Sequence, residues 1–346
     1  MEVQPHAPER LAVVLNGNAK NVTAEVVDTL EEILDSGDLF VSRSLEEAGS
    51  IAETLVDRGY KTVLTGGGDG TFTSVVTRVV HLAEARGVEP PQFGLLRLGT
   101  GNSLAWFVGA HGVGRRGLAA DLHALRDRAG SRPLRLVEVE GHLAPFCGFG
   151  IDANVLADFH RVRDVFRALP VPMRWATGLV SYGLAATTMS MPKYLFKKVP
   201  RVRVVNLGAT AYAIGQGGKV LDRPVYERGE TIFEGPARMA SISTIPYYGF
   251  GFRVFPFATA REDRMSLRIT TIGPSEFVPN VRGLWRGTYQ NPNSLWDYLI
   301  DRVRVELDVS TAFQIGGDAM GERTSVEVGI TRRPVQIVDL YAPPRR

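Results

Sequence analysis

The chain has 346 residues, of which 44% are hydrophobic and 22% are charged, so we expect a globular protein with two domains. Its 40 basic and 37 acidic residues leave a net charge of +3, which excludes nucleic-acid binding driven by bulk charge. The single cysteine, Cys147, excludes an internal disulfide and fits a reducing compartment.

The first ten residues, MEVQPHAPER, are polar and contain a proline. They lack the apolar run of a secretory signal. We therefore expect a cytoplasmic protein.

Apolar runs alternate with helical patterns over the first third of the chain. Residues 22–35, 44–59 and 73–86 have apolar side chains at helical spacing, and Ser44 followed by Glu47 is typical of a capping box. Strands that alternate with helices predict a parallel sheet, so residues 11–133 are expected to form a doubly wound α/β domain. The predicted strands of this domain are LAVVL, FVSRS, YKTVLT and FGLLRL.

Glycine-rich turns follow two of these strands. TGGGDGT at 65–71 and GTGNSLAW at 99–106 both lie where a strand ends, and Asn16 ends the first strand. Ligands of doubly wound sheets bind beyond the carboxyl ends of the strands. Glycine there admits positive φ and lets backbone N–H groups approach a phosphate. A carboxylate beside phosphate requires a cation or an acceptor hydroxyl between them, so Asp69 points to phosphoryl transfer.

A simpler interpretation is that both segments are tight turns and that Asp69 caps the following helix. Neither turn has the spacing of a Walker A loop or of the GxGxxG dinucleotide fingerprint.

Taken together, these motifs resemble those of the diacylglycerol kinase catalytic family, which includes bacterial lipid kinases, sphingosine kinases and ceramide kinases. The resemblance implies an N-terminal α/β nucleotide domain, a β-sandwich-like second domain, and an ATP-dependent kinase of a lipid alcohol. The matching stretches are LNGNAK, GGGDGT, LLRLGTGNSLA, GFGIDANV, PYYGFGFRVFPFATAREDRMSLRI and FQIGGDAMGE.

The resemblance also implies a binding site for ATP and Mg²⁺. Asp69 would contact the metal and accept the proton of the substrate hydroxyl, with Asp318 as a weaker catalytic candidate. Because Asp69 lies in a turn, we expect it to contribute little to packing. The residues implied to hold the nucleotide are Asn16, Gly66, Gly67, Gly68, Gly70, Thr71, Thr100, Gly101 and Asn102.

Three carboxylates of the family pattern are missing or shifted. No Asn-Glu pair follows Thr71, and Ser103 stands where the family usually has an aspartate. Near the C-terminus Gly316, Gly317 and Asp318 replace the usual Asp-Gly-Glu, unless a short insertion keeps Asp318 and Glu322 in the site. Two alternatives therefore stay open: a catalytically inactive relative that binds nucleotide or lipid, and a soluble-substrate kinase of the NAD kinase type.

Residues 134–340 are expected to form the second domain, mainly an antiparallel β-sandwich that binds the lipid. PNSLWDYLIDRVRVELD, residues 292–308, is interpreted as a short helix that enters a strand. The other strand-like runs are RPLRLVEVEG, RVRVVN, ATAYAIG, ARMASIS, MSLRITTI, DRVRVELDV and TSVEVGI.

The segment 160–203 has nine basic residues against one acidic residue, Asp164, around the uncharged run 175–192. A membrane-spanning helix needs ~20 predominantly apolar residues, and this run is diluted by Gly, Ser and Thr. A buried helix fits the pattern, and so does an apolar lip with a basic rim that docks on an anionic membrane surface. We expect a peripheral membrane protein with a lipid alcohol as substrate and no nucleic-acid partner. The oligomeric state is left open.

Overall fold

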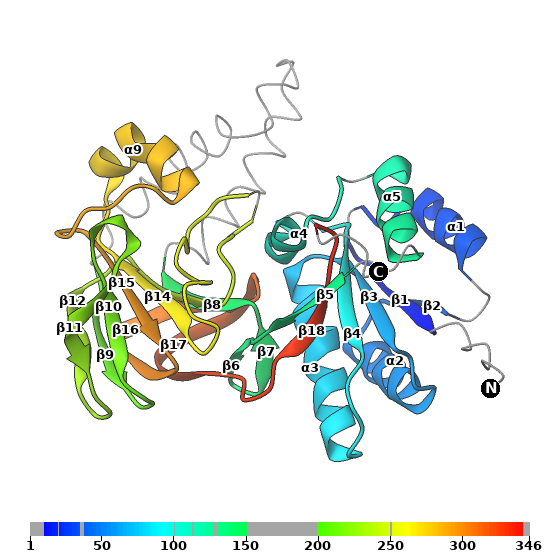
Figure 1. Ribbon diagram of the computed structural model, residues 1–346, viewed down its shortest axis with the longest axis horizontal. Helices are drawn as coiled ribbons and strands as arrows, with labels where there is room; N and C mark the ends of the chain where they lie inside the picture. The colour runs from blue at the N-terminus through cyan, green and yellow to red at the C-terminus, as the bar shows by residue number, and fades with distance from the viewer. Residues whose placement is uncertain are drawn as a thin grey trace, which may run out of the picture. The chain divides into compact units, whose positions relative to one another are not determined.

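The computed structural model describes residues 10–19, 21–34, 38–99, 101–112, 114–126, 130–150, 199–249 and 251–341 (Figure 1). The chain divides into two units, and each is described by itself. The first comprises Met1–Arg135, Gly141–Ala144 and Arg332–Arg346, and the second comprises Leu136–Glu140 and Pro145–Thr331.

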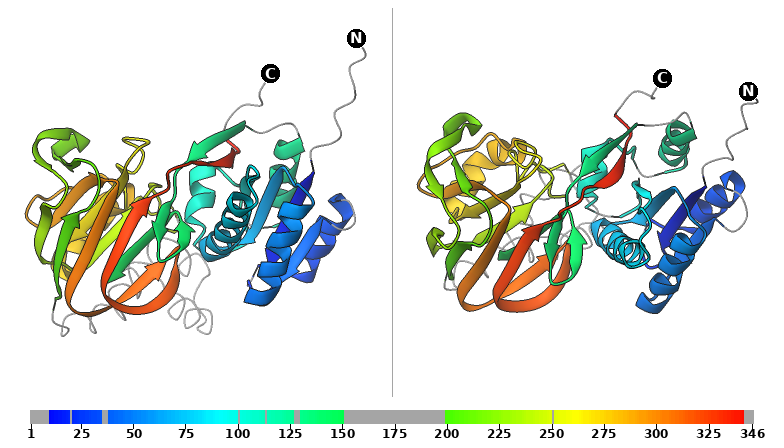
Figure 2. Two further views of the ribbon diagram at one scale, coloured as in Figure 1. Left: turned by 90° about the horizontal axis from the view of Figure 1, so that it is seen from below. Right: turned by 60° about the horizontal axis from the view of Figure 1, so that its bottom comes forward.

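A mostly parallel sheet forms the centre of the first unit. The strand order is β2-β1-β3-β4-β18-β5, and all neighbours are parallel except β18 and β5. β18 comes from the end of the chain and runs beside β5 (Figure 2). The strands are β1 (Leu11–Asn16), β2 (Leu39–Ser42), β3 (Thr62–Gly67), β4 (Gln92–Arg97), β5 (Gly130–Leu134) and β18 (Val335–Asp339).

Helices follow the strands as the sequence predicts. Ser44 Oγ accepts from the backbone N–H of Glu47 at 3.1 Å, while the Glu47 carboxylate accepts from the N–H of Arg43, so the expected capping box is confirmed with its return bond one residue earlier. The helices of this unit are α1 (Ala24–Ile33), α2 (Leu45–Asp57), α3 (Asp69–Ala85), α4 (Ser103–Val108) and α5 (Arg115–Arg126).

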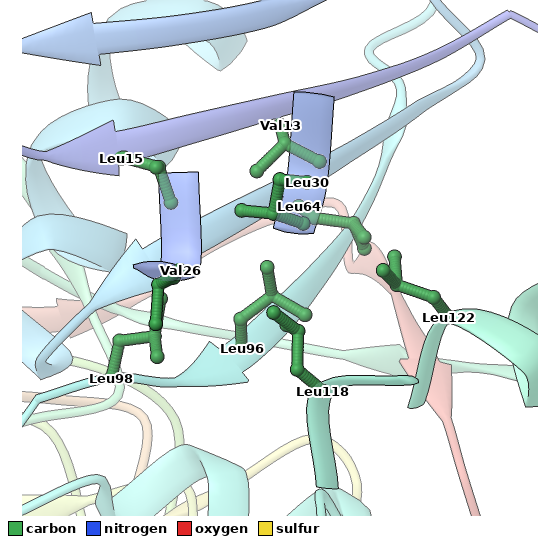
Figure 3. Packing of buried hydrophobic residues seen from close by; sticks show 9 residues of the cluster. All are labelled: Val13, Leu15, Val26, Leu30, Leu64, Leu96, Leu98, Leu118 and Leu122. Carbon is green, nitrogen blue, oxygen red and sulfur yellow. The ribbon is translucent and has the colours of Figure 1, made fainter. Parts of the chain in front are cut away.

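One face of the sheet is covered by α1 and α5. Side chains from β1, β3 and β4 point toward the two helices and form a core of aliphatic residues (Figure 3). The members shown are Val13, Leu15, Val26, Leu30, Leu64, Leu96, Leu98, Leu118 and Leu122.

The other face is covered by α2 and α3 (Figure 1). Phe72 of α3 meets Phe93 of β4 edge to face, with ring centroids 6.3 Å apart, and both rings are fully buried. A sheet with helices on both faces is the predicted doubly wound α/β domain, and this prediction is confirmed.

The second unit is built on an antiparallel sheet, which confirms the predicted β-rich domain. Its main path is β11-β10-β15-β14-β13-β8-β16-β17-β6. The long strand β16 pairs with β9 along its first half and with β8 at its end, so one hydrogen-bonded sheet branches there. The strands are β6 (Val137–Val139), β8 (Phe146–Gly150), β9 (Arg201–Asn206), β10 (Ala211–Ile214), β11 (Val220–Tyr226), β12 (Thr231–Pro236), β13 (Met239–Ser243), β14 (Met265–Thr270), β15 (Leu295–Ile300), β16 (Arg302–Ile315) and β17 (Asp318–Ile330).

Two features of this unit differ from the sequence analysis. The helix expected at the start of 292–308 is wrong, because residues 295–300 form β15 between β14 and β10. Asp297 on β15 forms two hydrogen bonds with the buried Arg268 of β14, at 2.7 and 2.9 Å, and this cross-strand pair fixes the strand register. A helix that the sequence analysis missed, α9 (Pro274–Arg286), lies in the connection between β14 and β15.

Candidate functional site

The two glycine-rich turns lie side by side where β3 and β4 end. β3 pairs with β4 up to Gly67 and Arg97. A Cβ built on Gly99 would lie 2.2 Å from the Cα of Gly68 and 2.5 Å from the carbonyl oxygen of Gly67. The two backbones therefore approach so closely that no side chain fits at Gly99.

The glycines of the first turn serve different purposes. A Cβ on Gly66 would lie 2.3 Å from the Leu15 side chain, and one on Gly67 would lie 2.3 Å from Thr71 Oγ1. A Cβ on Gly68 would meet nothing closer than the Cα of Gly99, at 3.8 Å. A Cβ at Gly66 or Gly67 would therefore force a neighbouring side chain to move, whereas a Cβ at Gly68 would make only an ordinary van der Waals contact with the described residues.

Gly68 also corrects one expectation about this turn. Its φ of −100° and ψ of −173° are extended values that any residue can adopt. Positive φ is therefore not the reason for glycine here. Gly68 is the N-cap of α3 and makes no side-chain capping hydrogen bond to the first turn of that helix.

Asp69 joins the two turns. Its carboxylate accepts a hydrogen bond from the backbone N–H of Ser103 at 2.8 Å and another from Leu104 at 3.1 Å, which are the first two residues of α4. Only 7% of Asp69 is exposed. The expectation that this residue contributes little to the fold is wrong, because it caps α4 from the start of α3. Asp69 does cap a helix, as the simpler interpretation expected, but that helix is α4 and not α3, which follows Asp69 directly.

The second turn is held by its own asparagine and by a neighbouring one. Asn102 adopts a left-handed backbone with φ of 50°, which asparagine tolerates better than most residues. Its Oδ1 accepts from Gly99 N at 3.1 Å and its Nδ2 donates to Gly99 O at 2.6 Å. Asn21 Nδ2 donates to the same carbonyl at 3.3 Å. The side chain of Asn102 is therefore used inside the turn.

Asn16 reaches the first turn from β1. Its Nδ2 donates to Thr71 Oγ1 at 3.1 Å, and its Oδ1 accepts from the N–H of Asn18 at 3.0 Å. The structure thus brings Asn16, Thr71 and the glycines of both turns to one edge of the sheet. Gly70 and Gly101 are partly exposed members of the same turns, and Thr100 lies outside the described residues.

Asp318 belongs to the second unit. It is exposed and pairs with Ile315 across a two-residue turn at the start of β17. Both turn residues, Gly316 and Gly317, have positive φ, of 57° and 86°, which tight hairpins require. The glycines of this motif are therefore explained by the hairpin, and the catalytic role of Asp318 stays a prediction.

The sequence analysis missed two polar contacts beside the second turn. Arg97, the last residue of β4, lies over the ring of Trp106 at 4.3 Å, and burial lowers the pKa of its guanidinium. Asp121 on α5 accepts hydrogen bonds from both the backbone N–H and the ring of His111. Burial raises the pKa of Asp121 even though His111 lowers it. The only signal for Arg97 in the sequence is that a basic residue ends an apolar strand.

The described part of the chain contains no group of three or more His, Cys, Asp or Glu side chains that could hold a metal ion. None of its helices has the length and apolarity required to cross a membrane.

Most of the basic segment 160–203 lies outside the described residues. Its two described members, Arg201 and Arg203, form ion pairs with Glu234 and Glu306 on neighbouring strands, at 3.9 and 3.7 Å. These two arginines are therefore engaged within the second unit and do not add to a local basic excess.

The fold and the paired glycine turns define a class of two-domain proteins with an α/β unit and an antiparallel β unit. A diacylglycerol kinase from Bacillus anthracis str. Sterne has a solved structure with a TM-score of 0.56 at 11% identity, covering 96% of this chain and 97% of that one. A candidate diacylglycerol kinase from the same organism reaches a TM-score of 0.61 at 13% identity, covering 95% and 97%. At these identities the likeness shows the fold alone.

The family follows from the sequence match of the first unit. Residues 10–137 match the diacylglycerol kinase catalytic domain family. A curated relative, "Probable lipid kinase YegS-like" from Enterobacter sp. (strain 638), is 35% identical over 106 residues, which are 30% of this chain. The matched residues span only 33% of the length of that relative. The expected family is thereby confirmed for these residues.

Proposed function

We propose that this protein is an ATP-dependent lipid kinase that phosphorylates the hydroxyl of a long-chain lipid alcohol of the diacylglycerol, sphingosine or ceramide type. One observation carries the proposal: within the stretch that matches the diacylglycerol kinase catalytic domain, a Cβ would fit at Gly68, whereas a Cβ at Gly66, Gly67 or Gly99 would overlap a neighbour. A glycine that the fold does not require is explained by a ligand that approaches the backbone.

The chemistry of the open space suits a phosphate chain. The N-terminus of α3 has no side-chain cap, so its N–H groups and helix dipole favour an anion. Asn16 and Thr71 lie beside it and are joined to each other by a hydrogen bond, so their polar groups are held in place. The proposed nucleotide contacts are these two side chains and the backbone of both glycine turns.

Asp69 is the proposed catalytic carboxylate. Each of its oxygens accepts a backbone N–H, so its carboxylate is held in a defined orientation at the meeting of the two turns. We assign to it the orientation of a substrate hydroxyl, or the ligation of a cation through one oxygen. Mg²⁺ binds proteins through one or two carboxylates plus substrate phosphates, and it would supply neutralisation of phosphate charge. Asp318 stays a second candidate.

The lipid alcohol is proposed to reach the protein from a membrane surface. The second unit is the proposed lipid-binding part, because the glycine turns of the first unit are assigned to the nucleotide. Peripheral membrane association is proposed as well, since the substrate of such a kinase resides in the bilayer.

The test is phosphate transfer from labelled ATP to diacylglycerol, sphingosine, ceramide and NAD⁺, each presented to the purified protein with Mg²⁺. A Gly68→Val variant is the matched control, because a Cβ at this position meets nothing closer than 3.8 Å and the added side chain would occupy the proposed approach of the phosphates. We expect transfer to a lipid alcohol by the wild type only. Transfer to NAD⁺ alone would favour the soluble-substrate kinase. ATP binding without transfer to any acceptor would favour the inactive relative.

A further inference from the structure

Helix α9 is packed against the second unit along one side. Leu284 is buried with Ile272 and Leu295, and the ring of Trp285 is stacked on Phe252 with centroids 5.1 Å apart and planes within 5°. Leu284 therefore fixes the inner side of the helix, and Trp285 lies at the border of that side, with one ring face covered by Phe252 and partial exposure.

Both ends of α9 are also held. The Oε1 of Glu276, in the first turn, accepts hydrogen bonds from Tyr289 Oη at 2.6 Å, from Asn291 Nδ2 at 2.8 Å and from the Ser294 hydroxyl. At the other end the N–H of Arg253 donates to Trp285 O at 3.0 Å. The helix is thus a rigid platform whose orientation does not depend on its outer side.

The outer side of α9 combines an apolar residue with basic ones. Val278 is 50% exposed, an unusual value for a large apolar side chain in this structure. Arg282 and Arg286 follow it at intervals of four residues, so all three side chains lie on neighbouring positions of one helical face. Trp285, partly exposed, flanks them. We call Val278, Arg282, Trp285 and Arg286 the α9 face.

Within the segment 271–296, the charged side chains on the α9 face are all positive. Between residues 271 and 296 the charged residues are Glu276, Arg282 and Arg286, and Glu276 is occupied by three donors on the inner side. Arg253, which is exposed, adds a third positive charge next to the end of the helix. An exposed apolar and aromatic edge with a positive rim is complementary to an anionic lipid surface.

We propose that the α9 face is a docking surface for anionic lipid bilayers. Val278 and the edge of Trp285 would enter the headgroup region, and Arg282 and Arg286 would contact lipid phosphates. The inference rests on the lipid-kinase function proposed above, because that function gives the protein a reason to dock on a membrane. Its test measures only binding to vesicles and involves no turnover. A helix that is anchored from within offers this surface at little cost in conformational entropy.

The experiment compares co-sedimentation with vesicles of phosphatidylcholine alone and of phosphatidylcholine mixed with phosphatidylglycerol. We expect the wild type to bind the mixed vesicles and to be released as salt rises. The double change Arg282→Gln and Arg286→Gln should weaken partition roughly 30-fold, because each arginine near the surface contributes roughly a factor of five. Val278→Ser should weaken it further. The matched control, Arg332→Gln with Arg333→Gln, removes the same charge from two exposed positions of the first unit and should leave partition unchanged.

Three results would overturn the docking surface: equal binding of the α9 variant and the wild type, equal loss in the control pair, or a change of oligomeric state in the α9 variant with vesicle binding retained. The last result would assign the face to a protein partner. Urea denaturation of the α9 variant, with a transition like that of the wild type, checks that it is folded. If the wild type phosphorylates no lipid alcohol, loss of vesicle binding in the α9 variant would still support the docking surface, although the kinase function would fail. Full binding by the α9 variant of an active kinase would remove the docking surface alone.

Discussion

Asp69 combines two roles that the sequence presents as alternatives. Its carboxylate caps α4 through Ser103 and Leu104, and Asp69 directly follows Gly68, where the nucleotide is proposed to approach. Because α4 follows the second glycine turn, the cap also fixes the distance between the two turns. A residue in this position couples the shape of the proposed site to its chemistry, so its replacement should affect both stability and activity.

We therefore predict two separate effects of Asp69→Asn. Phosphate transfer should be lost, and the free energy of unfolding should fall by about 1–3 kcal/mol, because the amide turns a donor toward one of the two N–H groups of α4. Urea denaturation measures the second effect and single-turnover kinetics the first. Asp121→Asn is the matched control, since it changes another buried carboxylate of the first unit that accepts a backbone N–H, that of His111. It should lower stability while the folded enzyme keeps its turnover.

A second prediction separates the glycines of the two turns. Gly68→Ala should fold with stability within about 1 kcal/mol of the wild type, because its extended backbone and the 3.8 Å clearance accept a methyl group, although alanine is a poorer N-cap than glycine. It should nevertheless weaken ATP binding, which isothermal calorimetry measures. Gly99→Ala should instead destabilise the first unit, because its Cβ would overlap the Gly68 backbone. Unchanged ATP affinity in folded Gly68→Ala would reduce the first turn to a structural element.

These residue-scale distinctions lie beyond the sequence for a physical reason. The motif identified Gly66 to Thr71 as a special turn, because four glycines and a carboxylate between a strand and a helix are rare. Which glycine serves the fold depends on neighbours such as Leu15 and Gly99, which are distant in the chain. The partner of Asp69 is likewise set by the meeting of two turns in space.

At the scale of elements, local periodicity predicted the first four strands and the helices between them. Their patterns are strong because β1, β3 and β4 are largely buried on both faces, while β2 is a partly buried edge strand. β15 was misinterpreted because Asp297 interrupts its apolar run, and its buried partner Arg268 lies on another strand. α9 was missed because it contains Pro279 and Gly283, which weaken a helical pattern, and because its stability comes from tertiary contacts.

The anchoring of α9 leads to a pH prediction. Burial alone would raise the pKa of Glu276, but hydrogen bonds from Ser294, Tyr289 and Asn291 hold it below its ordinary value. The folded protein therefore binds this proton less readily than the unfolded chain, so the stabilisation is present above about pH 4.3 and is lost as the pH falls further. Glu276→Gln should show a shallower loss of stability over this acidic range in urea titrations. Parallel curves for the two proteins would contradict the role of Glu276 as a charged anchor.

At the scale of the whole molecule, the chain leaves the first unit and returns to it. β18 inserts between β4 and β5, so β5 has its described strand partner only because residues from the far end of the chain are present. The sequence analysis assigned residues 134–340 to a single second domain, and no local pattern distinguishes β18 from the strands before it. Long-range pairing of this kind depends on the register of another strand, which a single sequence does not reveal.

The returning strand provides the final prediction. Ile337 is fully buried and is paired with Phe93 of β4 on one side and Arg132 of β5 on the other. Ile337→Ala should lower the free energy of unfolding of the first unit by about 2–5 kcal/mol, because it leaves a cavity in a strand between two partners. ATP should therefore bind less tightly to the variant near its unfolding transition, although Ile337 is not among the residues of the glycine turns.

Exposed Gln336, the adjacent residue of the same strand, provides the matched control. Gln336→Ala should change stability by less than about 0.5 kcal/mol, because it removes no buried contact. Thermal unfolding followed by tryptophan fluorescence, with and without ATP, compares the two variants. A fragment that ends at residue 137, as the catalytic family match does, should fail to unfold cooperatively, because β5 then loses its partner strand. Cooperative unfolding and ATP binding by that fragment would show that β18 is dispensable, and that the unit which binds the nucleotide is encoded by one continuous stretch of sequence.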